Sequence, residues 1–217
     1  MSDAAAQPPR IVRMVRRRPV AATLWFLVLA MIPVVLAMRL RATPLQDFGE
    51  VPTFRLTNQL GAQFGSDELR GRVWIANFMF TSCPSSCPRL TRHMARVQTR
   101  LSDIRDEVRL VSFSVDPTVD TPERLRTYAG RYGVDARMWS MLTGPNDAVQ
   151  RISVQGFNLA VEAPAYEGAR PANYNILHGE HIMLIDQRMH IRGYFRADAT
   201  GLDQVTRAAR RLLRDGH

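Results

Sequence analysis

The stretch RVWIANFMFTSCPSSCP, Arg72–Pro88, says most about the fold of this 217-residue chain. Its first nine residues form an apolar, β-prone run that is typical of a central, buried strand. The following eight residues hold the only two cysteines of the chain, Cys83 and Cys87, and each cysteine is followed by a proline. Proline suits the first turn of a helix, where its missing N–H costs nothing. The cysteines are therefore expected between the end of a buried strand and the start of a helix.

Two thiols spaced C-x-x-x-C in this position favour reactive or metal-binding chemistry over a purely structural role. The N-terminus of a helix stabilises negative charge, so we expect it to lower the thiol pKa and favour the thiolate. A structural disulfide would close so short a loop that it would constrain the unfolded chain little. A structural zinc site normally has four protein ligands. Two thiolates and one imidazole suit copper better, because thiolate matches Cu(I) and imidazole accepts either oxidation state.

The imidazole must come from one of five histidines: His93, His178, His181, His190 and His217. The first is expected on the helix after the cysteines, where its spacing gives it no reason to face the sulfurs. His190 falls at a predicted hairpin turn, and His217 is the final residue of the given sequence. His178 ends a long loop predicted over 162–177, so it could swing over the cysteines. His181 is expected at the start of the next strand, where the pleat fixes its direction.

Strand and helix patterns alternate on both sides of the cysteine pair. Strands are predicted at 51–56, 72–80, 108–115 and 138–142, and a hairpin at His181–Asp186 and His190–Phe195. The helix after the cysteines has an apolar face of Leu90, Met94, Val97 and Leu101. Three more helices are predicted: one capped by Thr121, one from Asn146 to near Gly156, and one capped by Thr200. The alternation predicts an α/β fold, a mixed sheet flanked by helices.

The basic residues of the chain are concentrated at its N-terminal end. All 29 are arginine, and seven of them lie in the first 41 residues, where Asp3 is the only acid. Residues 42–217 therefore carry 22 arginines against 19 acidic residues, a net charge of +3. So small an excess argues against a basic nucleic-acid-binding face on the main domain.

The N-terminal region reads as a membrane anchor. Residues 20–38 contain no charge and would form a helix about 28 Å long, close to the ~30 Å hydrocarbon core of a bilayer. A cleavable signal peptide is the rival interpretation. Because most of the flanking arginines precede the span, the sequence predicts a cytoplasmic tail at 1–19, an anchor at 20–38, a linker at 39–50 and an outer domain at 51–217. Outside the cytoplasm the cysteines can cycle between oxidised and reduced states.

Four segments together resemble the Sco/SenC copper-chaperone family over roughly residues 48–213: GRVWIANFMFTSCPSSCPRL, SFSVDPTVDTPERLRTYAGRYG, MLTG and HGEHIMLIDQRMHIRGYF. The resemblance implies a thioredoxin-like fold with one membrane anchor. It implies copper bound by Cys83, Cys87 and a distal histidine, which a gapless alignment through Leu184–Asp186 places at His178. Leu177 stands where the family commonly has an acidic residue, so His181 remains an alternative ligand. Asp116 and Asp120 match an acidic pair of the family, and turn formation and helix capping are the alternative roles.

The resemblance also implies a function in assembling the copper centre of cytochrome c oxidase. The implied partners are its copper-accepting subunit and, beyond it, other copper chaperones or thiol oxidoreductases. The implied location is the bacterial inner membrane, with the domain in the periplasm. Two other functions stay open: a thiol–disulfide oxidoreductase that reduces cysteines of a copper-accepting partner, and a peroxiredoxin-like peroxidase. The region H-G-E-H-I-M supplies imidazoles where thioredoxin-type oxidoreductases place a cis-proline, which favours metal binding over catalysis.

Overall fold

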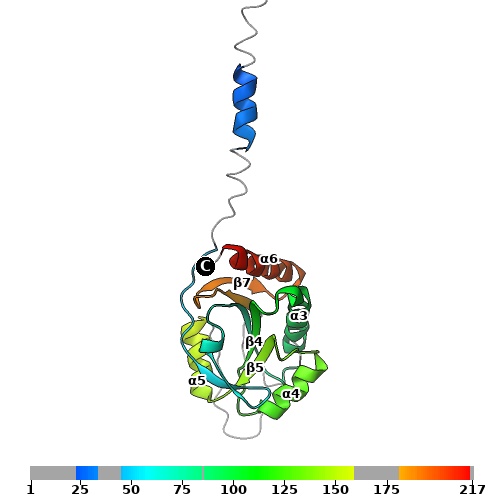
Figure 1. Ribbon diagram of the computed structural model, residues 1–217. Helices are drawn as coiled ribbons and strands as arrows, with labels where there is room; N and C mark the ends of the chain where they lie inside the picture. The colour runs from blue at the N-terminus through cyan, green and yellow to red at the C-terminus, as the bar shows by residue number, and fades with distance from the viewer. Residues whose placement is uncertain (1–22, 34–44, 85, 159–180, 216–217) are drawn as a thin grey trace, which may run out of the picture. The chain divides into compact units, whose positions relative to one another are not determined.

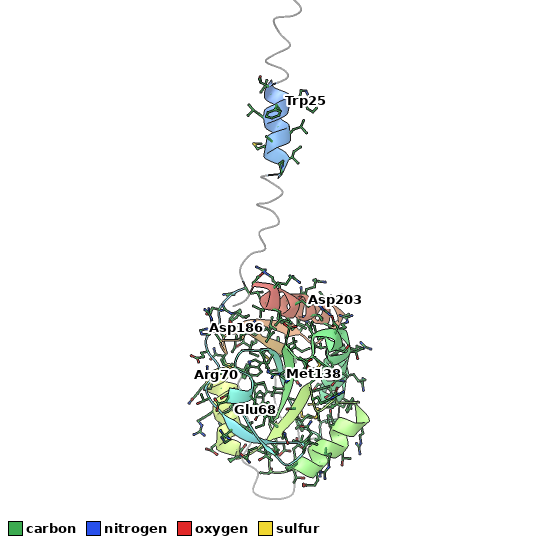
Figure 2. All side chains as sticks on the ribbon, viewed as in Figure 1. Trp25, Glu68, Arg70, Met138, Asp186 and Asp203 are labelled. Atoms are coloured by element: carbon green, nitrogen blue, oxygen red, sulfur yellow. The ribbon has the colours of Figure 1, made fainter. Side chains whose placement is uncertain are left out.

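A computed structural model describes residues 23–33, 45–84, 86–158 and 181–215 of the chain. The chain divides into two compact units, Met1–Pro44 and Leu45–His217. In the first unit, residues 23–33 form a helix whose apolar side chains, Trp25 among them, are exposed (Figure 2). Within the described ranges, no helix is both long and apolar enough to cross a membrane. The basic tail and the two ends of the predicted anchor lie outside those ranges.

The second unit is built on one mixed sheet, as predicted (Figure 1). The sheet has seven strands, of which Gln63–Gly65 was not predicted. Its strands lie in the order β2-β1-β5-β4-β3-β6-β7. The three central strands β3, β4 and β5 are parallel, and every other pairing in the sheet is antiparallel. The strands are β1 (Arg55–Asn58), β2 (Gln63–Gly65), β3 (Val73–Met79), β4 (Val108–Ser114), β5 (Trp139–Thr143), β6 (His181–Ile185) and β7 (Ile191–Arg196).

Helices cover both faces of this sheet. Figure 1 shows α3, α4 and α6 on one side and α5 on the other. The elements are α3 (Ser86–Arg100), α4 (Pro122–Arg131), α5 (Asn146–Arg151), which continues as the π-helix η3 (Ile152–Gly156), and α6 (Ala199–Asp215), with short 3-10 turns η1 (Ser66–Glu68) and η2 (Ser102–Ile104). The predicted apolar face of α3 is buried: Leu90, Met94, Val97 and the adjoining Leu101.

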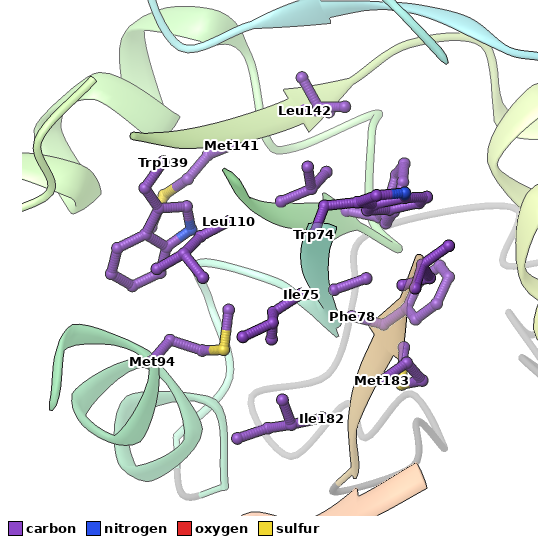
Figure 3. Packing of buried hydrophobic residues seen from close by; sticks show 14 of the residues in the cluster. Trp74, Ile75, Phe78, Met94, Leu110, Trp139, Met141, Leu142, Ile182 and Met183 are labelled. Carbon is purple, nitrogen blue, oxygen red and sulfur yellow. The ribbon is translucent and has the colours of Figure 1, made fainter. Parts of the chain in front are cut away.

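Strand β3 is the centre of the core, because all seven of its residues are buried. Its side chains alternate between the two faces of the sheet. Ile75 lies toward Met94 of α3, whereas Trp74 and Phe78 lie on the opposite face (Figure 3). On that opposite face Phe157 makes edge contacts with the rings of Trp74 and Phe78, at centroid distances of 6.1 and 5.4 Å. The predicted buried strand and its position before the cysteines are thus confirmed.

Two sequence predictions were wrong in detail. The first strand begins at Arg55 rather than at residue 51, because the backbone N–H of Val51 donates to the carbonyl of Met189 instead of joining β1. The final helix is capped by Asp198 and not by Thr200, which lies inside α6. The Asp198 carboxylate accepts a hydrogen bond from the Gly201 N–H at 2.8 Å. The cap predicted at Thr121 of α4 is confirmed by a bond from the Arg124 N–H.

The described end of the predicted linker is attached to β7. The Phe48 N–H donates to the carbonyl of Ile191, and the Ile191 N–H donates to the carbonyl of Gly49. The Asp47 carboxylate lies 3.0 Å from Nδ1 of His190. Residues 47–51 therefore form the entry to the folded domain rather than a free connection.

Candidate metal centre

Cys83 and Cys87 lie at the junction between β3 and α3, as predicted. Cys83 precedes the helix and Cys87 lies in its first turn. Neither is in a disulfide, and both are buried. The backbone N–H of Cys87 donates to Sγ of Cys83 at 3.3 Å, and Oγ of Ser86 lies 3.5 Å from the same sulfur. The start of the helix thus surrounds one sulfur with polar groups and directs the other toward the core.

Burial, rather than the helix terminus, dominates the chemistry of Cys87. Loss of hydration raises the pKa of Cys87 far above the usual range of a thiol, and a hydrogen bond with the Phe80 backbone opposes that shift only in part. The expectation of a lowered thiol pKa is therefore wrong for this residue. The raised pKa favours the protonated thiol of Cys87, so a metal ion must displace that proton in order to bind.

A buried carboxylate positions the loop that carries the cysteines. Asp120 accepts hydrogen bonds from the backbone N–H and the hydroxyl of Thr81, and from the hydroxyl of Ser114. Burial raises the pKa of Asp120, whereas the bonds from Ser114 and Thr81 lower it. Because Thr81 follows β3 and Ser114 ends β4, Asp120 ties together the carboxyl ends of two neighbouring parallel strands beside Cys83.

Asp116 has the turn-forming role that was the alternative for the acidic pair. Its carboxylate accepts from the hydroxyl of Thr118 at 3.0 Å, and its carbonyl accepts from the N–H groups of Val119 and Asp120. Asp120 has a different role, because Thr121 caps α4. Neither Thr81 nor Ser114 was predicted as part of the site. Their only signal in the sequence is a polar residue at the end of each of two apolar strands.

A second polar chain connects the first turns of α3 to α4. The hydroxyl of Thr91 donates to the carbonyl of Cys87 at 2.8 Å and lies 2.9 Å from the hydroxyl of Tyr128. The Tyr128 ring in turn lies 4.8 Å from the ring of Tyr132, measured between centroids. The backbone of Cys87 is therefore held by contacts that reach the end of α4.

Among the candidate histidines, His178 and His217 lie outside the described residues. His181 begins β6 and is exposed, while Met183 and Ile185 on its strand are buried as expected. Register places β6 directly beside β3. Within the described part of the chain, no three His, Cys, Asp or Glu side chains form a group that could hold a metal ion. The choice between His178 and His181 stays a prediction.

The remaining histidines have other surroundings. His190 faces Asp47, 3.0 Å away. His93 of α3 lines a cavity of about 490 Å³ together with His181, Arg89, Arg196 and residues 197–199. Neither cysteine lines this cavity.

Comparison with known proteins gives consistent matches along the second unit. A model of the SCO1/SenC family matches residues 43–214. A protein of Stutzerimonas stutzeri described as copper-binding is 31% identical over 164 residues, which cover 75% of this chain and 76% of the relative. A SCO1 protein homologue of Bacillus subtilis is 36% identical over 119 residues, which cover 54% of this chain. The match spans only 62% of the length of that Bacillus relative.

Solved structures agree with these matches. The crystal structure of a SCO1/SenC family lipoprotein from Bacillus anthracis superposes with a TM-score of 0.70 at 32% identity, covering 79% of this chain and 99% of the other. A second structure, BsSco, superposes with a TM-score of 0.68 at 26% identity, covering 78% and 98%. Its description reports a disulfide switch in a member of the Sco family of cytochrome c oxidase assembly proteins. From the family match over most of its length, this chain belongs to the SCO1/SenC family.

Proposed function

We propose that this chain is a membrane-anchored copper-binding protein that delivers copper to the copper centre of cytochrome c oxidase. The observation that carries the proposal is the pair of buried thiols at the start of α3, joined by the bond from the Cys87 N–H to Cys83 Sγ. The copper-binding description of the Stutzerimonas relative and the oxidase-assembly description of BsSco support the same function.

Cys83, Cys87 and His178 are the proposed copper ligands, with His181 as the alternative third ligand. The loop after β3 and the first turn of α3 supply the two sulfurs, which form no disulfide. Two observations support metal binding over thiol–disulfide exchange as the main activity: the copper-binding description of the Stutzerimonas relative, and the imidazoles of the H-G-E-H-I-M region where oxidoreductases have a cis-proline. The raised pKa of Cys87 does not separate the two activities, because a metal ligand and an attacking thiol both need the thiolate.

A copper-binding assay of the reduced full chain tests the proposal. We expect one Cu(I) per chain, and loss of tight binding in both Cys83→Ser and Cys87→Ser. Oxidation of the pair to a disulfide should release the copper, because the sulfurs are then no longer thiolates. If the oxidised chain retains its copper, the two sulfurs are not the ligands. If the reduced chain binds no copper but reduces a partner disulfide, the oxidoreductase function is the correct one.

Membrane attachment is the other part of the proposal. It rests on the charge-free residues 20–38 and on the excess of arginine before them. A phosphatase that works only outside the cytoplasm should be active when it is fused after His217, and washing the membranes at high pH should not extract the chain. Activity of a different reporter, one that works only in the cytoplasm, at the same position would contradict this topology.

A further inference from the structure

Helix α3 carries a concentration of positive charge directly after the cysteine pair. It contains four arginines and no acidic residue. Arg100, at its end, forms an ion pair with Asp203 of α6. Arg89, Arg92 and Arg96 are exposed, and their spacing places them on one face of the helix.

Helix α4 adds a further positive charge beside α3. Arg131, at the end of α4, lines a cavity of about 510 Å³ together with Arg92, Arg96, Ala95 and Tyr132. No acidic residue lines that cavity. In the described part of the chain, the side chains of Arg92, Arg96 and Arg131 make no ion pair or hydrogen bond, whereas many other surface arginines, such as those at 137 and 210, are paired with aspartate. The exposed side chains of Arg89, Arg92, Arg96 and Arg131 are called the α3 basic surface below.

The field of these arginines is felt by a neighbouring side chain. Burial lowers the pKa of His93, and the positive charges of Arg96, Arg89 and Arg92 lower it further, against an opposing effect of Asp198. The arginines on the exposed face of α3 thus act together at one point. An incoming group of negative charge would relieve the repulsion among them.

We propose that the α3 basic surface docks an acidic segment of a partner protein beside the cysteine pair. The charges extend over seven residues of helix, or about 10 Å along its axis, so several carboxylates in a row fit them better than one compact anion does. Cavities lie on both sides of α3. The one with Arg92, Arg96 and Arg131 has no acidic residue, whereas the one with Arg89 and His93 also contains Asp198, which pairs with Arg196. Figure 1 shows α3 between α4 and α6, and these two helices contribute Arg131 and Ala199 to the cavities.

The α3 basic surface begins close to the cysteine pair, so docking there would serve copper transfer if the proposed function is correct. Arg89 is two residues from Cys87, so a partner held here would present its own metal-binding groups close to the sulfurs. Tyr132 of the cavity is joined to Cys87 through Tyr128 and Thr91 by the contacts described above. Binding of the acidic segment itself requires neither copper nor free thiols.

The test measures binding of a fluorescent deca-glutamate peptide to the reduced, copper-free full chain in detergent. The variant Arg92→Gln/Arg96→Gln/Arg131→Gln should bind the peptide about tenfold more weakly, because it cannot form three exposed ion pairs with the glutamates of the peptide. The matched control Arg188→Gln/Arg207→Gln/Arg214→Gln removes the same charge from exposed arginines elsewhere and should bind as the parent does. The charge-conserving variant Arg92→Lys/Arg96→Lys/Arg131→Lys should retain most of the binding.

Further measurements separate the occupant from its rivals. Amide chemical shifts of the parent chain should move on addition of the peptide at Ala95, Tyr132 and His93, which locates the site without any variant. Inorganic phosphate, added at the same total negative charge as the peptide, should displace the peptide only weakly. Micelles doped with phosphatidylglycerol should do the same. The variant Cys83→Ser/Cys87→Ser should bind the peptide normally, so failure of the copper proposal leaves this one standing.

Several results would overturn the proposal. Equal weakening in the matched control would mean that net charge alone attracts the peptide. Equal binding in the parent and in the glutamine variant, or shifts confined to another surface, would place the peptide elsewhere. Displacement by phosphate or by the anionic lipid at least as strong as by unlabelled peptide would assign the surface to that ligand instead.

Discussion

The carboxylate of Asp120 accepts hydrogen bonds from both the backbone N–H and the hydroxyl of Thr81. Thr81 lies two residues before Cys83, so a fully buried carboxylate sets the start of the cysteine loop. The third bond, from Ser114, anchors that carboxylate to the end of β4. The position of the sulfurs is therefore determined by two adjacent strand ends, and not only by the helix that follows them.

Replacing Asp120 by alanine should destabilise the chain markedly. Three donors, the two of Thr81 and the hydroxyl of Ser114, would lose their acceptor, and each unpaired buried group costs about 1–3 kcal/mol. Urea unfolding measures the effect. The control Ser114→Ala removes one donor together with its bond to Asp120 and leaves only the Asp116 N–H without its acceptor, so it should cost about 1–3 kcal/mol, less than Asp120→Ala. An unchanged urea midpoint for Asp120→Ala would mean that the network does not hold the loop.

Copper affinity should rise with pH. Burial raises the pKa of Cys87, so the copper-free thiol stays protonated throughout the neutral range and copper must displace the proton. Each displaced thiol proton should increase the apparent affinity about tenfold per pH unit. Competition against a Cu(I) chelator of known protonation, repeated at several pH values, gives the slope. A flat profile would contradict either the buried thiol or its role as a ligand.

The attachment of residues 47–51 to β7 should depend on Asp47. Two hydrogen bonds lower the pKa of Asp47: the larger effect comes from the Gly49 backbone N–H and the smaller one from His190. The carboxylate therefore contributes stability that is present above the usual pKa of aspartate and is lost as the pH falls through the lowered value.

At neutral pH, Asp47→Ala should accelerate hydrogen exchange of the Phe48 and Val51 amides, both of which donate to the hairpin. Asp135 is the matched control, because it is another aspartate whose pKa is lowered by its own partners, here Arg137. Asp135→Ala should leave the exchange of these two amides unchanged. Unaltered exchange in Asp47→Ala would show that the backbone bonds alone hold the segment.

The corrected helix cap gives a further prediction. Asp198→Ala should cost about 1 kcal/mol of unfolding free energy, the usual value for loss of an N-cap. Thr200→Ala should cost much less, because Thr200 lies inside α6 and the Gly201 N–H is bonded to Asp198. Thermal unfolding of the two variants compares them directly. A larger loss in the threonine variant would restore the cap predicted from the sequence.

Patterns that depend on burial were predicted well from the sequence. The apolar run before the cysteines is β3, the stripe from Leu90 to Leu101 is buried, and the paired apolar runs after residue 180 form the hairpin of β6 and β7. These signals are strong because an apolar run or a periodic face has few other ways to leave water.

Predictions that depend on competition between neighbours were less accurate. Val51 is buried as an apolar residue should be, yet its N–H binds Met189 rather than a strand of the sheet. Asp198 and Thr200 are both good caps, and only the backbone path decides between them. The pKa of Cys87 depends on how far the first turn of α3 is buried, which no local pattern reports. The bonds of Asp120 to Thr81 span 39 residues and likewise have no local signature.

Metal analysis of the reduced full chain, comparing the parent with His178→Ala and His181→Ala, tests the copper centre most directly. Loss of one of three ligands should abolish tight binding, an effect larger than the ~10–100-fold changes typical of groups that only support a ligand. We expect one copper per chain in the parent and in His181→Ala, and none bound tightly in His178→Ala, whose fold and thiols remain intact. Normal copper binding by His178→Ala together with failure of His181→Ala would move the third ligand to β6. Normal binding by both variants would contradict a centre of two thiolates and one imidazole.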